Sequence, residues 1–125
     1  MTPKKLCLVV DDSDVIRRVA RQLLASMEFD VTEAVSGPEA LEQCQAKMPD
    51  AIIVDWHMPS MNGQEFISSL RMQPKGDKPV ILYCTTENDP VDIARALSAG
   101  ADEYMLKPFD REALRAKLVE SGIVE

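Results

Sequence analysis

Short apolar runs recur along this chain, and each is followed by a stretch with helical periodicity. The runs are LCLVV, DVTEA, AIIVD, VILYC and EYMLK, at residues 6–10, 30–34, 51–55, 80–84 and 103–107. DVTEA alternates and EYMLK is mixed, but the other three are continuously apolar. Continuous apolar runs of this length are typical of strands buried on both faces, as in a parallel sheet.

The first helical pattern covers residues 14–27. Its apolar positions follow helical spacing and are predicted to face the core: Ile16, Val19, Ala20, Leu23, Leu24 and Met27. The same spacing leaves Arg17, Arg18 and Arg21 largely to solvent, so we interpret these arginines as a solvated charged face.

The later helices are marked by capping residues as well as by periodicity. Ser36 and Glu39 form a capping-box signature for a helix over residues 37–47. A further amphipathic pattern covers residues 64–72. The last two helices are bounded by residues suited to helix ends, which are Asp89 and Gly100 for one and Asp110 and Gly122 for the other.

Strand and helix patterns therefore alternate five times. Helix crossovers between parallel strands are right-handed, so the helices must cover both faces of the sheet. We predict an α/β fold of the (βα)5 type, a doubly wound parallel sheet of five strands. The chain has no linker-like, repetitive or low-complexity segment, and we expect one domain over residues 1–125.

Composition excludes several function classes. The formal net charge of −7 argues against nonspecific nucleic-acid binding, which depends on clustered Lys and Arg. It also argues against binding to an anionic membrane surface. No apolar run approaches transmembrane length. Cys7, Cys44 and Cys84 lie far apart without a C-x-x-C motif, and we interpret them as buried free thiols. With no signal peptide, the chain is predicted to be cytoplasmic.

Polar residues follow the apolar runs at the strand ends, where open parallel sheets bind ligands. They are Asp11 and Asp12 after 6–10, Asp55 at the end of 51–55, Thr85 and Thr86 after 80–84, and Lys107 at the end of 103–107. Two carboxylates about 4 Å apart repel by ~4 kcal/mol at an effective dielectric of 20. Such a cluster protonates or recruits a cation, and hard oxygen ligands open to water suit Mg²⁺.

These groups are the parts needed for in-line phosphoryl transfer to a carboxylate. A metal ion would neutralise an incoming phosphoryl group and leave one carboxylate oxygen to attack. Lys107 would pair with a second phosphoryl oxygen, and Thr85 would hydrogen-bond another.

Taken together and in order, these motifs are specific. The chain resembles a response-regulator receiver domain of two-component signalling, most of all the single-domain, CheY-like chemotaxis type, over its whole length. The matching residues are Asp11-Asp12 after LCLVV, Asp55 after AIIV, the MPSMNG loop, Thr85 after VILYC, Tyr104, and Lys107-Pro108-Phe109. The resemblance implies the flavodoxin-like strand order 2-1-3-4-5.

The resemblance also implies a role for each acidic residue. Asp55 is expected to accept a phosphoryl group from a sensor histidine kinase or a phosphotransfer protein. Asp12 and Asp55 are expected to bind Mg²⁺, for which Mn²⁺ can substitute. Asp11 is expected to act through water, and His57 to offer its backbone carbonyl to the metal.

Other residues are implied to carry the response to phosphorylation. Lys107 is expected to contact the phosphoryl group and to precede a cis proline bond. Thr85 is expected to move toward the phosphoryl group, after which Tyr104 turns inward and reshapes the face of the fourth helix, fifth strand and fifth helix.

The neighbours of the acceptor are expected to set how long the phosphoryl group persists. His57, Thr86 and Glu87 occupy positions that tune hydrolysis in the family. The chain is expected to assist its own phosphorylation and autodephosphorylation without turning over a separate substrate, so it is not an enzyme in the usual sense.

The implied partners are the phosphodonor and an output protein, of which a flagellar motor switch is one candidate. Direct binding to nucleic acid or membrane is not expected. The chain is expected to be a monomer or a phosphorylation-dependent dimer. A role as a phosphorelay shuttle or phosphate sink would need the same residues.

Two alternatives belong to other classes. Asp12-Ser13-Asp14 partly resembles the D-x-D motif of haloacid-dehalogenase-type phosphatases, in which the first aspartate is the nucleophile. The chain could also be a pseudo-receiver scaffold that is never phosphorylated. Trp56, the only tryptophan, directly follows Asp55 and is expected to report Mg²⁺ and phosphoryl analogues by fluorescence.

Overall fold

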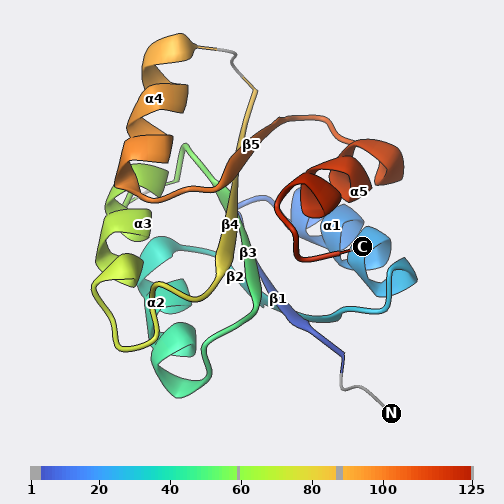
Figure 1. Ribbon diagram of the computed structural model, residues 1–125, viewed down its shortest axis with the longest axis horizontal. Helices are drawn as coiled ribbons and strands as arrows, with labels where there is room; N and C mark the ends of the chain where they lie inside the picture. Colours follow the sequence, from blue (N-terminus) through green and yellow to red (C-terminus); the bar gives the residue numbers. More distant parts are fainter. Residues whose placement is uncertain (1–3, 59, 87–88, 125) are drawn as a thin grey trace.

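The computed structural model describes residues 4–58, 60–86 and 89–124, and in them a parallel sheet is enclosed by helices (Figure 1). The strands lie in the order β2-β1-β3-β4-β5, and every pairing is parallel. This confirms the predicted fold class and strand order. The strands are β1 (Leu6–Val10), β2 (Asp30–Ala34), β3 (Ala51–Asp55), β4 (Val80–Thr85) and β5 (Glu103–Leu106).

The helices form a layer on each side of the sheet. Figure 1 shows α1 and α5 on one side and α2, α3 and α4 on the other. Because α1, α2, α3 and α4 each connect two parallel strands, their division between the two sides follows from the right-handed crossovers and the strand order. The helices are α1 (Asp14–Ser26), α2 (Gly37–Ala46), α3 (Gly63–Arg71), α4 (Pro90–Ala99) and α5 (Arg111–Glu120).

The sheet separates two apolar cores. In β1, Leu8 and Val10 pack into the core beneath α2, α3 and α4. The alternate residues Cys7 and Val9 pack into the core beneath α1 and α5. All of β3 is buried. The continuous apolar runs therefore mark strands covered on both faces, as predicted.

Each helix begins at a residue whose side chain accepts a backbone N–H, which stabilises a helix start by ~1 kcal/mol. These N-caps are Ser13, Ser36, Asn62, Asp89 and Asp110. The observed boundaries differ from the predicted ones by one or two residues, as is common at helix and strand ends.

The predicted orientation of the first helix was wrong in two places. Arg17 is buried with 9% of its surface exposed, whereas Val19 is 39% exposed. Arg17 turns inward because its guanidinium donates to the Asp11 carbonyl and to the carboxylates of Asp14 and Glu33. The spacing of apolar residues could not predict that Arg17 faces inward, because Asp11 and Glu33, which hold it there, lie outside this helix.

The three cysteines are buried free thiols, as expected. Burial raises the pKa of the Cys44 thiol to about 11. It also raises the pKa of Cys84 to about 12, so these thiols remain protonated at neutral pH. Within the described residues, no helix combines the length and apolarity that crossing a membrane requires.

Candidate acidic site at the carboxyl edge of the sheet

Polar residues from four strands meet at one edge of the sheet. Asp11 follows β1, Asp55 and Thr85 are the last residues of β3 and β4, and Lys107 follows β5. The backbone N–H of Lys107 donates to the Thr85 carbonyl at 2.8 Å. The fold thus brings together side chains that are far apart in sequence.

Lys107 lies between two carboxylates. Its ammonium donates to Asp11 Oδ2 at 2.7 Å and to Asp55 Oδ1 at 2.9 Å. All three side chains are largely buried, with exposures of 11%, 4% and 8% respectively. The Lys107–Pro108 peptide bond is cis, as the resemblance implied.

Burial and the neighbouring charges shift the pKa values of Asp55 and Lys107. Burial raises the pKa of Asp55, and the charge of Asp11 adds to this, although hydrogen bonds from Lys107 and the His57 backbone oppose it. Burial acts to lower the pKa of Lys107, but hydrogen bonds to Asp11 and Asp55 outweigh it, so this pKa is raised. Lys107 therefore remains a cation at neutral pH.

A third carboxylate, that of Asp12, lies in the same cluster. Asp11, Asp12 and Asp55 each offer an oxygen, and these atoms lie within 4.8 Å of one another. Asp12 is exposed, and its carboxylate makes no hydrogen bond or ion pair with any described residue. An all-oxygen donor set with one side open to water fits Mg²⁺, which retains several waters when bound to proteins. The residues present can therefore hold a divalent cation.

Within the described residues, the other predicted site residues differ in exposure. Thr85 is buried with 1% exposure, whereas Thr86 and His57 are exposed. Glu87 lies outside the described residues.

A row of aromatic rings leads from the acidic edge toward α5. The rings of Trp56 and Tyr83 meet edge to face with centroids 4.9 Å apart, and Tyr83 and Tyr104 lie 6.3 Å apart. Tyr104 is half-buried, and the Lys117 ammonium from α5 lies 5.0 Å from its ring centroid. The sequence pointed to Trp56 and Tyr104 but not to Tyr83 or Lys117. Tyr83 lies inside an apolar run and Lys117 on a helix, and neither position reveals which side chains the residue contacts.

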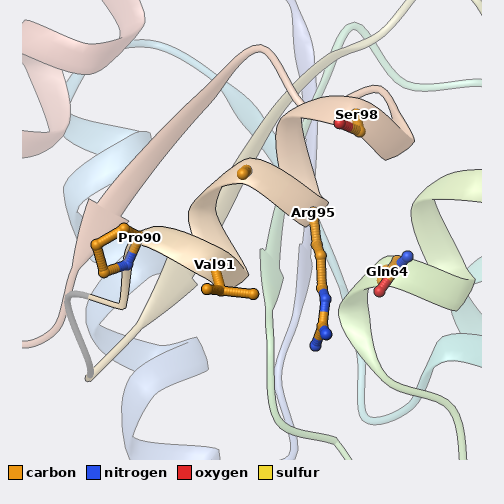
Figure 2. A pocket seen from close by; sticks show the side chains of 6 residues that line it. Gln64, Pro90, Val91, Arg95 and Ser98 are labelled. Atoms are coloured by element: carbon orange, nitrogen blue, oxygen red, sulfur yellow. The ribbon is translucent and has the colours of Figure 1, made fainter.

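A separate groove of about 420 Å³ lies between α3 and α4. Figure 2 shows Val91 and Arg95 on α4 beside Gln64 on α3. Pro90, Ala94 and Ser98 complete its lining, so none of the predicted site residues contributes to it.

Comparison with known proteins decides the family. Residues 7–119 match the family model of the response regulator receiver domain. The chain belongs to this family. The receiver domain is 36% identical over 113 residues to the chemotaxis protein CheY1 of Helicobacter pylori, covering 89% of this chain and 91% of CheY1.

Solved structures agree with this assignment. Chemotaxis protein CheY4 of Vibrio cholerae has a TM-score of 0.90 and 36% identity, covering 94% of this chain and 98% of CheY4. The receiver domain of the sensor histidine kinase PA1611 from Pseudomonas aeruginosa, solved with a magnesium ion coordinated in its active site cleft, has a TM-score of 0.86. The two sequences are 28% identical, and the match covers 95% of this chain and 98% of the PA1611 domain.

Membership fixes the class of function. The chain is a phosphorylation-controlled switch of two-component signalling, of the chemotaxis-like CheY type. A receiver domain of this type interacts with a histidine kinase and an output target, and it does not belong to a catalytic enzyme family in the usual sense. The receiver family, rather than a dehalogenase-type phosphatase, accounts for residues 7–119.

Proposed function

We propose that Asp55 accepts a phosphoryl group from a phosphohistidine of a sensor kinase or phosphotransfer protein, with Mg²⁺ bound beside it. The observation that carries this proposal is the arrangement of Lys107 between Asp11 and Asp55, with the Asp12 carboxylate in the same cluster. A transferring phosphoryl group needs positive charge around it, which Lys107 and a metal ion held by the acidic cluster would supply.

Each residue of the acidic site has its own part in the proposed chemistry. Lys107 holds Asp55 Oδ1, so Oδ2 is the attacking atom in this proposal. The new bond joins Oδ2 to phosphorus as the bond from phosphorus to the imidazole nitrogen breaks. That nitrogen keeps the electron pair and takes up a proton. Lys107 then turns from the carboxylate to a phosphoryl oxygen, and Thr85 donates to another.

Mg²⁺ would be held by the carboxylates of Asp12 and Asp55 and the His57 backbone carbonyl, with Asp11 helping through water. When bound, Mg²⁺ supplies positive charge that offsets the repulsion between acceptor and phosphoryl group. The magnesium-bound receiver of PA1611 and the oxygen cluster of this chain support this choice of metal. Mn²⁺, with similar ligand preferences, can substitute.

The signal leaves the site through Thr85 and Tyr104. Phosphorylation adds roughly −1.5 to −2 charge, which draws the Thr85 hydroxyl toward the phosphoryl group. Tyr104 turns inward into the vacated space and changes the surface formed by α4, β5 and α5. The neighbouring rings of Tyr83 and Trp56 support a packed path between site and surface.

We propose further that the chain assists its own phosphorylation and autodephosphorylation, with His57, Thr86 and Glu87 setting the hydrolysis rate. The exposure of Thr86 and His57 beside the pocket supports this. We expect residues 1–125 to form one cytoplasmic receiver domain, monomeric or dimerising on phosphorylation. Its relative CheY1 is named as a chemotaxis protein, which favours a chemotaxis output over a phosphorelay shuttle or sink, and we propose a motor switch as one candidate output protein.

Labelling tests the proposal directly. The protein is incubated with radiolabelled acetyl phosphate and Mg²⁺, and the labelled residue is mapped, with Asp55→Ala as the control. Label on Asp55 supports the proposal, whereas label on Asp12 would indicate phosphatase-type chemistry. If the protein takes up no label, and Trp56 fluorescence changes with neither Mg²⁺ nor beryllofluoride, the protein acts as a scaffold.

A further inference from the structure

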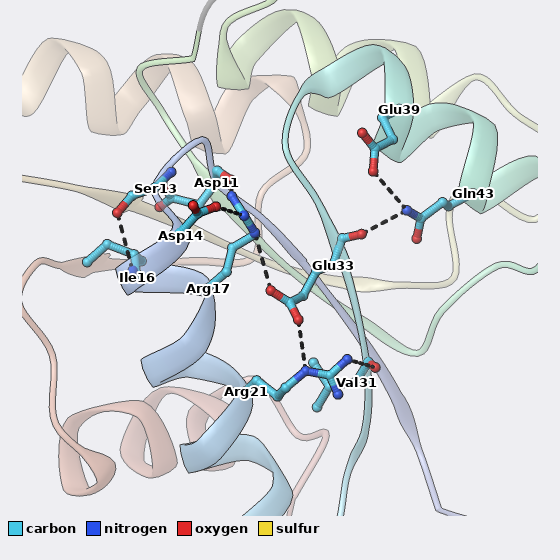
Figure 3. A network of polar contacts seen from close by, with 10 residues as sticks. All are labelled: Asp11, Ser13, Asp14, Ile16, Arg17, Arg21, Val31, Glu33, Glu39 and Gln43. Carbon is cyan, nitrogen blue, oxygen red and sulfur yellow. Dashed lines mark hydrogen bonds and ion pairs between the residues drawn. The ribbon is translucent and has the colours of Figure 1, made fainter.

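Arg17 is a buried cation that the phosphotransfer chemistry does not use. Its side chain is 10% exposed and forms ion pairs with Asp14 from its own helix and with Glu33 from β2. Its Nη1 also donates to the backbone carbonyl of Asp11 at 2.6 Å. Figure 3 shows this guanidinium between the end of β1, the start of α1 and β2.

The Asp11 carbonyl is one of four anchored groups on that residue. Its backbone N–H donates to the Ala34 carbonyl at 3.1 Å. Its carboxylate accepts from the Ser13 N–H at 2.9 Å through Oδ1, and from Lys107 at 2.7 Å through Oδ2. With Arg17 on the carbonyl, every backbone and side-chain polar group of Asp11 has a partner.

The next residue has no such support. The Asp12 carboxylate is exposed and bonds to no residue within the described ranges, yet it shares the oxygen cluster with Asp11 and Asp55. The Asp11 carbonyl belongs to the peptide unit that joins Asp11 to Asp12. Holding that carbonyl fixes the plane from which Asp12 projects, because a peptide unit is planar and rotates as one body.

We propose that Arg17 is a positioning residue, which holds the Asp11–Asp12 peptide so that the Asp12 carboxylate faces the metal position. The inference rests on the magnesium site of the proposed function. Arg17 acts through the backbone and does not touch the reacting atoms.

Glu33 keeps Arg17 in place. Its Oε1 accepts from Arg17 Nε at 3.2 Å, and its backbone carbonyl accepts from Gln43 Nε2 of α2 at 2.8 Å. Arg21 donates to the other Glu33 oxygen at 2.8 Å but is half-exposed and makes no contact with Asp11. Arg17 and Arg21 therefore share a carboxylate and differ in their access to the site.

The role requires an arginine rather than any cation. The planar guanidinium presents donors in several fixed directions, and here it serves a carbonyl and two carboxylates at once. A lysine keeps the charge but is a point donor on a flexible stem. Arg17→Lys thus separates the effect of geometry from that of charge.

The experiment measures Mg²⁺ affinity by calorimetry for the wild type, Arg17→Met, Arg17→Lys and the matched control Arg21→Met. Loss of an outer support of a metal ligand weakens binding by roughly 10–100-fold, so we expect about a tenfold or larger rise in Kd for Arg17→Met. Arg17→Lys should recover only part of the affinity, and Arg21→Met should stay within about twofold of the wild type.

A second measurement needs no metal. Amide hydrogen exchange at Ser13, whose N–H is bonded to Asp11 Oδ1, is followed in EDTA. We expect faster exchange in Arg17→Met than in Arg21→Met. Thermal unfolding of each variant verifies folding, and if Arg17→Met does not fold, Arg17→Lys and Glu33→Gln replace it, with a weaker loss of affinity expected for both.

The outcomes distinguish this inference from the proposed function. Wild-type protein that binds no Mg²⁺ would overturn the proposed metal site, and Ser13 exchange would still decide whether Arg17 holds the loop. Wild-type affinity in Arg17→Met, or full recovery in Arg17→Lys, would overturn the positioning role.

Discussion

The ammonium of Lys107 donates a hydrogen bond over 2.9 Å to the carboxylate of Asp55, and both side chains are largely buried. The same ammonium also serves Asp11 at 2.7 Å. One positive charge therefore faces two buried carboxylates, with the Asp12 oxygen close by. The acidic edge is under-neutralised, which is what makes it receptive to a further cation.

This imbalance predicts a pH-dependent effect of Asp55→Asn. The pKa of Asp55 is raised above 3.8 in the folded state, so folding binds this proton more tightly than the unfolded chain does. Stability from this group is present at low pH and is lost as pH rises from 3.8 through the raised value. In EDTA at pH 7, Asp55→Asn should therefore be more stable than the wild type, by about 1.4 kcal/mol for each unit by which folding raises the pKa of Asp55.

Urea unfolding between pH 3.5 and 7 measures this effect. The stability difference between the two proteins should narrow as pH falls toward 3.8. A difference that instead widens on acidification would show that ionised Asp55 stabilises the fold.

Asp12→Ala should separate metal binding from stability. Asp12 is exposed, and substitutions at exposed positions without partners usually change stability by less than about 0.5 kcal/mol. We expect the Trp56 fluorescence response to Mg²⁺ to be lost while the urea midpoint in EDTA is kept. A retained response would remove Asp12 from the metal site.

Tyr83→Phe should leave stability unchanged or raise it by up to about 1 kcal/mol. The Tyr83 hydroxyl is buried without a hydrogen-bond partner in the part of the chain that the structure describes, and its ring contact with Trp56 does not need the oxygen. Denaturant unfolding tests this, with Tyr104→Phe as a comparison. Destabilisation beyond 1 kcal/mol would reveal a partner for the hydroxyl.

Lys117→Met should favour the inward arrangement of Tyr104 that we propose for the phosphorylated state. The ammonium over the Tyr104 ring contributes about 0.5–1 kcal/mol to the half-buried position of the ring. Losing it should increase the activated population by roughly twofold to fivefold, measured as phosphorylation at limiting acetyl phosphate. The control is Glu120→Gln, which alters the weaker 3.5 Å ion pair of Lys117. Equal phosphorylation in both variants would contradict a role for the ring contact.

The sequence predicted most of the fold because its signals are local. The apolar runs and capping residues such as Ser36 and Asp110 identify strands and helix starts without knowledge of their neighbours. The strand order came from resemblance, since apolar periodicity does not say which strands pair. Carboxyl-end residues such as Asp55 were predictable because a parallel sheet gathers those ends at one edge.

What the sequence did not predict depends on partners from distant segments. Arg17 looked like part of a solvated face, and only Glu33 on β2 together with the Asp11 carbonyl explains its burial. The contact between Tyr83 and Trp56 likewise depends on the packing of two neighbouring strands. The spacing of residues along the sequence does not predict such contacts between distant segments.

The hydrogen bond between Lys107 and Asp11 joins residues 96 positions apart. Asp11 and Asp55 therefore leave the ribosome long before Lys107, which follows β5. A partly synthesised chain has no complete acceptor site. Competence to receive a phosphoryl group should thus arise only after residue 107 has left the ribosome, so shorter nascent chains should not accept it.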